Sequence, residues 1–460
     1  MAANTGILTN NNGFYQTKYV YFAPSSTIAT TQEPLATYYC FLSRVLAWPS
    51  ETVPPVPTED TKNINQIFKN MFIAKKITSN DISPVIERIN WVSGEIYSYY
   101  EDNVNMFELD TNGTLLRRFY IKNRFDQVFK CLWNANGAAS TVEPYFEPGT
   151  FNANLIFQGN DDYKWKYMYT ITPGSKLKFM DDAWMPIPMA NTIPNPVYTS
   201  SGTGSVDVIN VISGGSGYDP ANSTISVTVT GPNTSQATAN ATVVSGSITD
   251  IVVANKGSNY IYANVIISSA NGSGANAIAQ VSPIGGHGYN AITELGARHV
   301  MMTASFSTDE SGKLPTDIDY RQIGILVNPL EIKSASTYGL ANGESYKLTT
   351  DYIVSPGFGD YIPDEFVYQS PDGTFSAATY FATTLSFDSI TNRLRVINTN
   401  GTANNSQVIY GQTSGTARVI TQTQTPTLVP FSGFITYIEN REPVVRDAQG
   451  SEQFRLVLGY

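Results

Sequence analysis

The stretch from residue 201 to 285 constrains the fold most, because it alternates small apolar and polar residues and does so twice. No charged residue occurs from Pro220 to Thr249, or from Gly257 to Thr293. Apolar side chains occupy every second position in residues 225–229 and 237–243. Because side chains of a β-strand point alternately to opposite faces, this period predicts short strands joined by Gly/Asn turns.

The same stretch repeats a motif. Ile209-x-Val211 followed by Gly215-Ser216-x-Tyr218 returns as Ile251-x-Val253 followed by Gly257-Ser258-x-Tyr260, 42 positions later (260 − 218). The alternating segment 237–243 returns at 275–281, 38 positions later (275 − 237). We therefore predict a duplicated β unit, since two copies are too few for a solenoid.

Changes in composition divide the chain into a core fold made of three pieces and two β-rich inserts. The core is predicted over residues 1–200, 286–335 and 431–460. The inserts are a duplicated β module at 201–285 and a second β module at 336–430. Within the second module, residues 365–370 and 407–415 read as related halves.

One helix is predicted after residue 57. Thr58 can cap it, and Glu59 and Asp60 suit the positive end of the helix dipole. An apolar stripe with helical spacing follows, made of Ile64, Ile67, Phe68, Met71 and Phe72.

Two core strands are predicted from alternation. In residues 163–171, Tyr163, Trp165, Tyr167 and Tyr169 share one face, and Lys164 and Lys166 point the other way. Residues 322–327 predict a further strand.

The whole composition indicates a folded, mainly β protein: a layered β-sandwich core with a few helices and two inserted small β domains. Charged residues make up 14% and aromatic residues 12% of the chain. The net charge of −10, without a Lys/Arg run, argues against nucleic-acid binding. No apolar run is long enough to predict membrane insertion, and the N-terminus does not resemble a signal peptide. Cys40 and Cys131 fit buried free thiols of a protein made in a reducing cytoplasm.

Residues capable of catalysis or ligand binding are few. His287 lies in a glycine-rich turn and His299 begins an apolar strand, so both are expected in turns or at the surface. The acidic pairs Asp161-Asp162 and Asp181-Asp182 read as solvated loops rather than as a catalytic carboxylate pair. Gly214–Asp219 fits the start of a calcium-binding nonapeptide repeat, but its second copy lacks the aspartate, which favours a turn. We therefore expect no enzymatic activity, no metal and no cofactor.

Six segments of the three core pieces resemble, in order along the chain, the baseplate wedge subunit called protein eight of T-even-like contractile-tailed phages. The most specific is Tyr320-Arg321-Gln322-Ile323-Gly324-Ile325-Leu326-Val327-Asn328-Pro329-Leu330-Glu331. The others are residues 41–50, 85–91, 159–173, 184–188 and 432–445.

This resemblance implies a structural subunit of the virion, assembled in the cytoplasm of the host bacterium and located in the tail baseplate. It implies a homodimer that contacts other baseplate wedge proteins and acts in baseplate assembly and in tail contraction at host attachment. The two inserts lie outside the matching segments. They resemble small β modules of other tailed-phage structural proteins.

Five residues are candidates for structural or interface roles. Tyr97, Tyr99 and Tyr100 form an aromatic cluster that suits a protein interface, although an ordinary core or surface position explains them too. Arg321 and Arg441 are predicted to be structural, each satisfying a buried polar group.

Two other function classes stay open. A host-surface carbohydrate-binding tail or fibre protein would carry its sites on exposed loops of the inserts. A tail-associated polysaccharide depolymerase would need a carboxylate pair that the sequence does not display.

Overall fold

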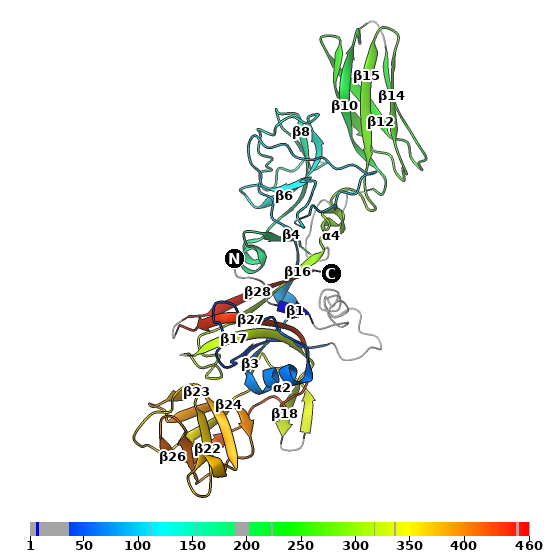
Figure 1. Ribbon diagram of the computed structural model, residues 1–460. Helices are drawn as coiled ribbons and strands as arrows, with labels where there is room; N and C mark the ends of the chain where they lie inside the picture. Colours follow the sequence, from blue (N-terminus) through cyan, green and yellow to red (C-terminus); the bar gives the residue numbers. More distant parts are fainter. Residues whose placement is uncertain are drawn as a thin grey trace. The chain divides into compact units, whose positions relative to one another are not determined.

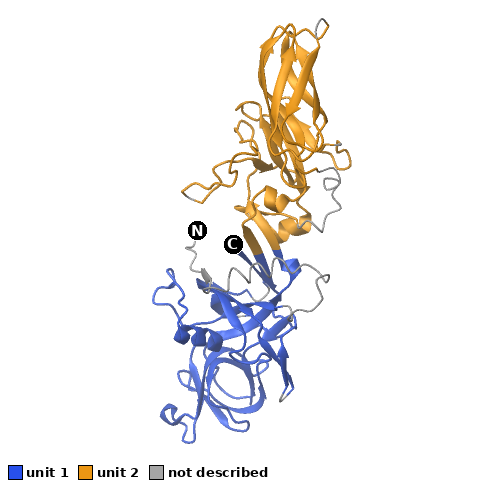
Figure 2. Ribbon diagram, turned by 90° about the vertical axis from the view of Figure 1, so that its right-hand side faces the viewer, with its two compact units in different colours: residues 1–82, 302–458, 460 blue, residues 83–301, 459 orange. Residues whose placement is uncertain are grey.

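The fold is described from a computed structural model of the chain. It describes residues 6–8 and 36–459, except for 112, 153, 189–201, 222–223, 317, 335–336 and 448–449. The predicted boundary between residues 200 and 201, and most of the first 35 residues of the predicted core, lie outside the described residues. The chain divides into two compact units, residues 1–82 with 302–458 (unit 1) and residues 83–301 (unit 2), which Figure 2 distinguishes by colour.

Unit 1 is built on a six-stranded antiparallel sheet. Its strand order is β1 (Gly6–Leu8), β27 (Phe434–Val445), β17 (Asp319–Val327), β2 (Tyr38–Ser43), β3 (Met71–Ile77) and β20 (Ser345–Lys347). Central strand β17, which includes the strand predicted at 322–327, is buried along nearly its whole length. Residues near the two ends of the described chain therefore meet in one sheet.

A second layer covers this sheet. In unit 1, β28 (Glu452–Gly459) lies beside β16 (His299–Phe306), the strand in which the chain passes between units. The Phe454 ring packs edge-on against Phe306 and Tyr320, with centroids 5.7 Å apart in each case. This aromatic contact joins the two layers of a β-sandwich.

Helix α2 (Thr61–Asn70) is shorter than the sequence pattern predicts. Its N-cap is Asp60, whose side chain accepts from the Asn63 amide, and not Thr58. The predicted apolar stripe is wrong at its end, because Met71 and Phe72 begin strand β3 and are buried in the sheet. Met71 and Phe72 continue the helical spacing of apolar residues, but the backbone there is extended because it pairs with β2.

Unit 2 contains a four-stranded antiparallel sheet ordered β5 (Tyr120–Lys122), β6 (Gln127–Asn134), β8 (Tyr163–Thr170) and β7 (Ile156–Gln158). Short β4 (Ile82–Glu87) pairs with β9 (Trp184–Pro186), and α3 (Pro173–Phe179) and α4 (Ala291–Glu294) lie in the connections. The β8 aromatic face predicted from alternation is confirmed, with Tyr163 stacked on Trp165 at 5.5 Å. Its opposite face, with Lys164 and Lys166, is buried as well.

Each unit also carries a small closed six-stranded barrel, labelled in Figure 1. Barrel 1, in unit 2, is ordered β10 (Val206–Ser216), β13 (Ser247–Asn255), β12 (Thr238–Val244), β11 (Ile225–Thr230), β14 (Asn264–Ser269) and β15 (Ser273–Val281). Barrel 2, in unit 1, is ordered β21 (Thr350–Val354), β24 (Arg393–Asn400), β23 (Tyr380–Asp388), β22 (Phe366–Gln369), β25 (Val408–Gly411) and β26 (Ala417–Gln424). The remaining strands, β18 (Leu330–Ser334) and β19 (Thr337–Leu340), form a hairpin in unit 1.

The two barrels share one topology. Counted within each barrel, both strand orders read 1-4-3-2-5-6. Exchanging strands 1, 2 and 3 with 4, 5 and 6 leaves this order unchanged, so each barrel has the pairing symmetry of a duplicated three-strand unit. In barrel 1, Ile209 pairs with Ile251, its own repeat partner 42 positions later (251 − 209). In barrel 2, Tyr368 pairs with Tyr410 at the same offset (410 − 368).

The repeated Gly-Ser-x-Tyr motif closes barrel 1. Gly215 and Gly257 have φ of +62° and +64°, and a Cβ on either would overlap a backbone carbonyl oxygen. The buried Tyr218 and Tyr260 hydroxyls accept from the amides of Ala275 and Ala237 at 3.3 and 2.8 Å. Both copies of the motif thus close the barrel in the same way. This structural role explains the residues that also fit a calcium-binding repeat.

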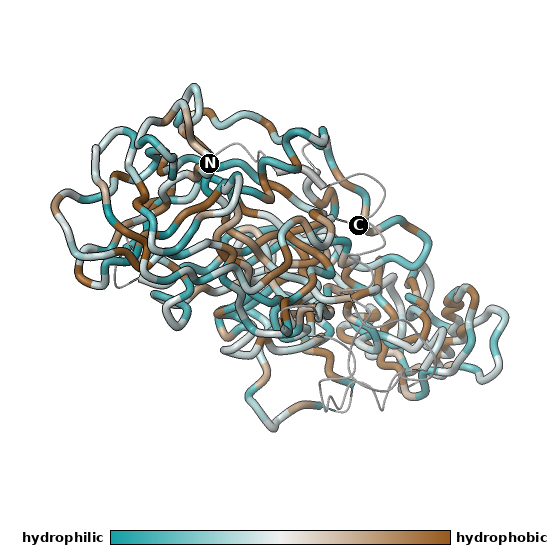
Figure 3. Tube along the Cα trace, turned by 90° about the horizontal axis from the view of Figure 1, so that it is seen from below, coloured by the Kyte–Doolittle hydropathy of each residue, from teal (hydrophilic) through white to brown (hydrophobic). Residues whose placement is uncertain are grey.

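The predicted fold class, mainly β with a layered core and two small inserted β domains, is confirmed. Hydrophobic and hydrophilic stretches alternate along the trace (Figure 3), as expected for strands with one face in a core. The ends and edges of these strands place several side chains, described next, where the barrels meet the sheets.

Candidate functional site

A buried ion pair lies where barrel 1 joins the sheet of unit 2. Lys130 of β6 and Glu294 of α4 are both buried, with Nζ and Oε2 2.8 Å apart. Glu294 Oε1 also accepts from the Gly288 amide at 2.7 Å. The ammonium of Lys130 stands 4.1 Å from the centroid of the Tyr100 ring, a cation–π geometry. Both charges are thus compensated in a site closed to solvent.

Each charge of this pair stabilises the ionised form of the other. Burial alone would raise the pKa of Glu294, but Lys130 and His287 lower it to about 2. Burial lowers the pKa of Lys130, and Glu294 opposes that effect. The neighbouring Lys166 has its pKa lowered to about 8 by burial. The site therefore holds a carboxylate whose ionisation depends on its buried cation.

His287 is the most unusual member of this junction. It lies in a turn, as the sequence predicts, but its side chain is buried and not at the surface. Its Nδ1 is 3.7 Å from Glu294 Oε2, and its ring meets the Tyr100 ring edge-on at 5.0 Å. Neither ring nitrogen has a hydrogen-bond partner among the described residues. Burial, assisted by Lys130, lowers the pKa of His287 to about 4.

We predict that acid weakens unit 2 through His287. Its pKa is about 4 when folded and near the ordinary 6.5 when unfolded, so the unfolded chain binds the extra proton between these values. Stability contributed by this group is therefore complete above pH 6.5 and is lost as pH falls toward 4. Between pH 7 and 4.5 the wild type should lose about 2–3 kcal/mol more than His287→Phe, measured by urea unfolding. Equal losses in both proteins would refute this role.

Barrel 1 contributes its own polar groups to the junction. Asp207 of β10 is buried and pairs with Lys256 at 2.5 Å. The buried Asn210 donates from Nδ2 to the Leu132 carbonyl of β6 at 3.1 Å. Lys164 of β8 pairs with Asp250 of β13 at 2.9 Å. Barrel 1 is therefore joined to β6 and β8 by two directional polar contacts, one to each strand.

Barrel 2 is joined to the sheet of unit 1 in a similar way. Arg44, directly after β2, is bidentate on Asp364, at 3.0 and 2.7 Å, and pairs with Asp319 at 2.7 Å. The fully buried Asp351 of β21 is surrounded by cations, with Lys347 at 3.3 Å, Arg395 at 3.6 Å and Arg393 at 3.8 Å. Lys347 ends core strand β20, so this cluster also links barrel to sheet.

The predicted interface tyrosines lie together in unit 2. Tyr97 is buried, with its ring edge-on to Trp165 at 5.5 Å. Tyr99 is half-buried against Trp133, and Tyr100 donates to the Val281 carbonyl of barrel 1 at 3.4 Å. Contacts within the chain account for all three, and their proposed role toward a partner stays a prediction.

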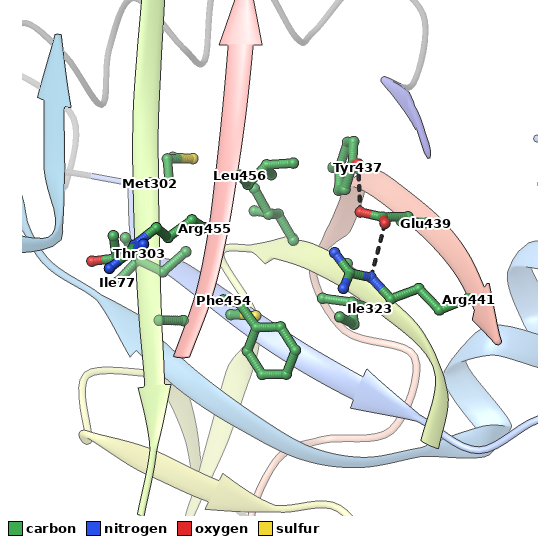
Figure 4. A pocket seen from close by; sticks show the side chains of 14 residues that line it. Ile77, Met302, Thr303, Ile323, Tyr437, Glu439, Arg441, Phe454, Arg455 and Leu456 are labelled. Atoms are coloured by element: carbon green, nitrogen blue, oxygen red, sulfur yellow. Dashed lines mark hydrogen bonds and ion pairs between the residues drawn. The ribbon is translucent and has the colours of Figure 1, made fainter. Parts of the chain in front are cut away.

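The two candidate arginines differ in environment. The Arg321 side chain is only 10% exposed and pairs with Asp319 at 2.7 Å and Glu51 at 3.3 Å. The Arg441 side chain is 38% exposed and pairs with Glu439 at 2.8 Å. Arg441 lines a small cavity of about 30 Å³ between the two layers of unit 1, where Tyr437 also donates to Glu439 (Figure 4).

We predict that Arg321→Lys lowers the melting temperature of the chain. The single ammonium of lysine cannot reproduce the planar guanidinium group, which pairs with two carboxylates. The expected loss in the free energy of unfolding is about 1–2 kcal/mol. Arg441→Lys serves as the matched comparison, because its more exposed pair should change stability by less than about 1 kcal/mol. Thermal melts of both variants provide the measurement, and an unchanged melt for Arg321→Lys would count against a structural role.

The acidic pairs serve loop structure. Asp161, predicted to be solvated, accepts from the backbone amides of Thr141 and Val142 at 2.8 and 2.9 Å. Asp181 accepts from the Ala183 and Trp184 amides at 2.8 and 2.7 Å. Both pairs lie in loops, as expected: Asp162 and Asp182 are exposed, and Asp161 and Asp181 are half-buried and hold their loops.

Sequence reasoning missed the junction residues. Lys130, Glu294 and Arg44 carry no local signal, because their ion-pair partners are distant in the chain. Within the described ranges, no group of three or more His, Cys, Asp or Glu side chains is placed to hold a metal ion. No helix in those ranges is both long and apolar enough to cross a membrane. Both cysteines are buried free thiols, as predicted.

Neither a known family model nor a curated protein sequence matches this chain.

Proposed function

We propose that this chain is a structural subunit of the baseplate wedge of a contractile-tailed phage. The observation that carries the proposal is the pair of charged junctions. Each barrel is closed, and each is joined to its neighbouring sheet by an ion pair, Lys164–Asp250 for barrel 1 and Lys347–Asp351 for barrel 2. A subunit that must keep its shape under the load of tail contraction benefits from inserts held in this way.

The chemistry of the junctions supports a fixed scaffold. Removing one partner of a buried pair leaves an uncompensated charge, at a cost of about 3–5 kcal/mol. Moving barrel 1 away from its sheet would separate Lys164 from Asp250 and Asn210 from the Leu132 carbonyl together. Such an arrangement resists partial opening and suits a structural part.

The partners proposed are a second copy of the chain and other wedge proteins. They follow from the resemblance of the three core pieces to the wedge subunit. The barrels lie outside that resemblance. We propose that they present additional surfaces to neighbouring baseplate proteins.

Immunogold electron microscopy tests this function. An antibody against the chain is applied to purified phage particles with extended and contracted tails. Label at the baseplate in both states is the expected result. Label confined to the tail fibres would favour the host-surface carbohydrate-binding role, and virions without label would refute a virion function.

A further inference from the structure

The β18–β19 hairpin of unit 1 turns its apolar face to solvent. Leu330 pairs with Leu340, and Ile332 with Tyr338. Directly opposed residues of an antiparallel pair share one face, so these four side chains form one apolar face without a charge. Leu330, Ile332 and Tyr338 are exposed.

The opposite face of the hairpin is polar and contacts the rest of unit 1 through Glu331. Glu331 accepts a hydrogen bond from the Tyr346 hydroxyl, and Tyr346 packs edge-on against the buried Tyr39 at 5.6 Å. Lys333 covers Gly339 on this face. The charged Lys333 side chain on this face is 54% exposed, and Tyr338 on the apolar face is 57% exposed, so the hairpin presents an apolar face to solvent in addition to its polar one.

The exposed apolar face marks an interaction surface. A two-stranded ribbon is marginally stable by itself in water, and an exposed apolar face costs further free energy. β18 is held on its other side, because the Leu330 carbonyl accepts from the Val429 amide at 2.8 Å and Ile332 donates to the Thr427 carbonyl at 3.1 Å. That support fixes the apolar face in place for a partner.

A second apolar feature adjoins the hairpin. A cavity of about 40 Å³ is lined by residues that include Phe68, Pro329, Leu428 and Phe431. Phe431 is half-exposed and has φ of +60°, a backbone conformation that bulky residues rarely adopt. Backbone strain of this kind is commonly kept where a side chain is presented to a partner.

The lack of charge on this face allows a second copy of this chain as the occupant. With a net charge of −10, two copies repel each other overall, and the repulsion is weakest where uncharged surfaces meet. All four residues of the hairpin face are uncharged, and the face presents the large Tyr338 ring beside smaller aliphatic side chains. A twofold axis sets one patch against its own copy, so Tyr338 of each chain can pack over the aliphatic residues of the other.

We infer that two copies associate face to face through the apolar side of the β18–β19 hairpin. This surface would mediate the self-association that is part of the proposed function, and its biological role rests on that proposal. Four side chains per copy, even with Phe431, fall short of the roughly 800 Å² per partner of a stable interface. Association is therefore concentration-dependent and is strengthened where an assembly brings copies together.

Cysteine cross-linking of the full chain tests the surface. Tyr338→Cys places a thiol on the apolar face, and Lys333→Cys places one on the opposite face. The two positions are matched in exposure, at 57% and 54%. The native Cys40 and Cys131 are buried and should remain silent. Under mild oxidation, Tyr338→Cys should form covalent dimers readily and Lys333→Cys should not.

Sedimentation velocity gives a second measurement that does not depend on oxidation. The mass of the wild-type chain should rise with concentration, Tyr338→Lys should stay monomeric, and Lys333→Ala should behave as wild type. Equal cross-linking of both cysteine variants, no cross-linking of either, or dimers of Tyr338→Lys would overturn the inference. If this surface fails while gold labels the baseplate, the proposed function stands. If Tyr338→Cys cross-links but no gold labels the virions, the chain self-associates through this surface and is not a baseplate protein.

Discussion

Replacing Glu294 with glutamine should lower the free energy of unfolding of unit 2 by about 3–5 kcal/mol. Glutamine keeps the size of the side chain and can still accept from the Gly288 amide. It removes the only carboxylate within ion-pair distance of Lys130 among the described residues. The buried ammonium is then left without a countercharge, in surroundings that already lower its pKa.

Urea unfolding followed by tryptophan fluorescence measures this loss. Four of the five tryptophans, at 91, 133, 165 and 184, lie in unit 2, so the signal reports mainly on that unit. Lys130→Met combined with Glu294→Gln should recover most of the stability, because no charge is then buried. Glu108→Gln breaks the exposed pair with Arg117 and should cost less than about 1 kcal/mol. If Glu294→Gln also lowered the free energy of unfolding by less than about 1 kcal/mol, the junction would contribute little to the stability of unit 2.

Replacing Asp351 with asparagine should destabilise barrel 2 by a similar amount, about 3–5 kcal/mol. Asp351 is fully buried and faces three cations, of which Lys347 at 3.3 Å is the nearest. The variant would leave positive charges that repel one another. High salt should restore part of the loss, because it screens the repulsion between the partly exposed groups.

Proteolysis at increasing urea, read from peptides of residues 350–424, measures the stability of this barrel. Asp388→Asn is the matched control, because Asp388 is exposed on the same barrel and an asparagine oxygen can still accept from the Ile390 amide. Asp351→Asn should become cleavable at lower urea than the wild type, whereas Asp388→Asn should not. Identical urea profiles for the two variants would contradict an anchoring role for Asp351.

Local alternation made several strands predictable. Residues 225–229 and 163–169 show the period of two, and both lie in strands. The repeat at an offset of 42 also predicted a duplication. In the structure, Ile209 of the first copy pairs with Ile251 of the second. Closure of the strands into barrels was beyond the sequence, because strand order depends on contacts between residues far apart.

Long-range packing explains what the sequence concealed. Lys164 and Lys166 alternate with aromatic residues, a pattern typical of a strand with one face in water. Both are buried because barrel 1, encoded some 40 residues later, covers that face (207 − 166 = 41). The burial of His287 has the same origin, since a glycine-rich turn gives no sign of the sheet packed over it. The helix prediction failed at Met71 for a related reason, because pairing with β2 outweighs local periodicity.

Native-state hydrogen exchange tests the central claim most directly, namely that each barrel and its sheet form one cooperative body. In unit 2, the slowest amides of β10 and β15 should exchange with the same opening free energy as those of β6 and β8, and all should respond alike to urea. Junction contacts such as Lys164–Asp250 would then open only with the whole unit. Amides of barrel 1 that exchange through a separate opening of lower free energy, while β6 and β8 stay protected, would show instead that the barrel moves independently of its sheet.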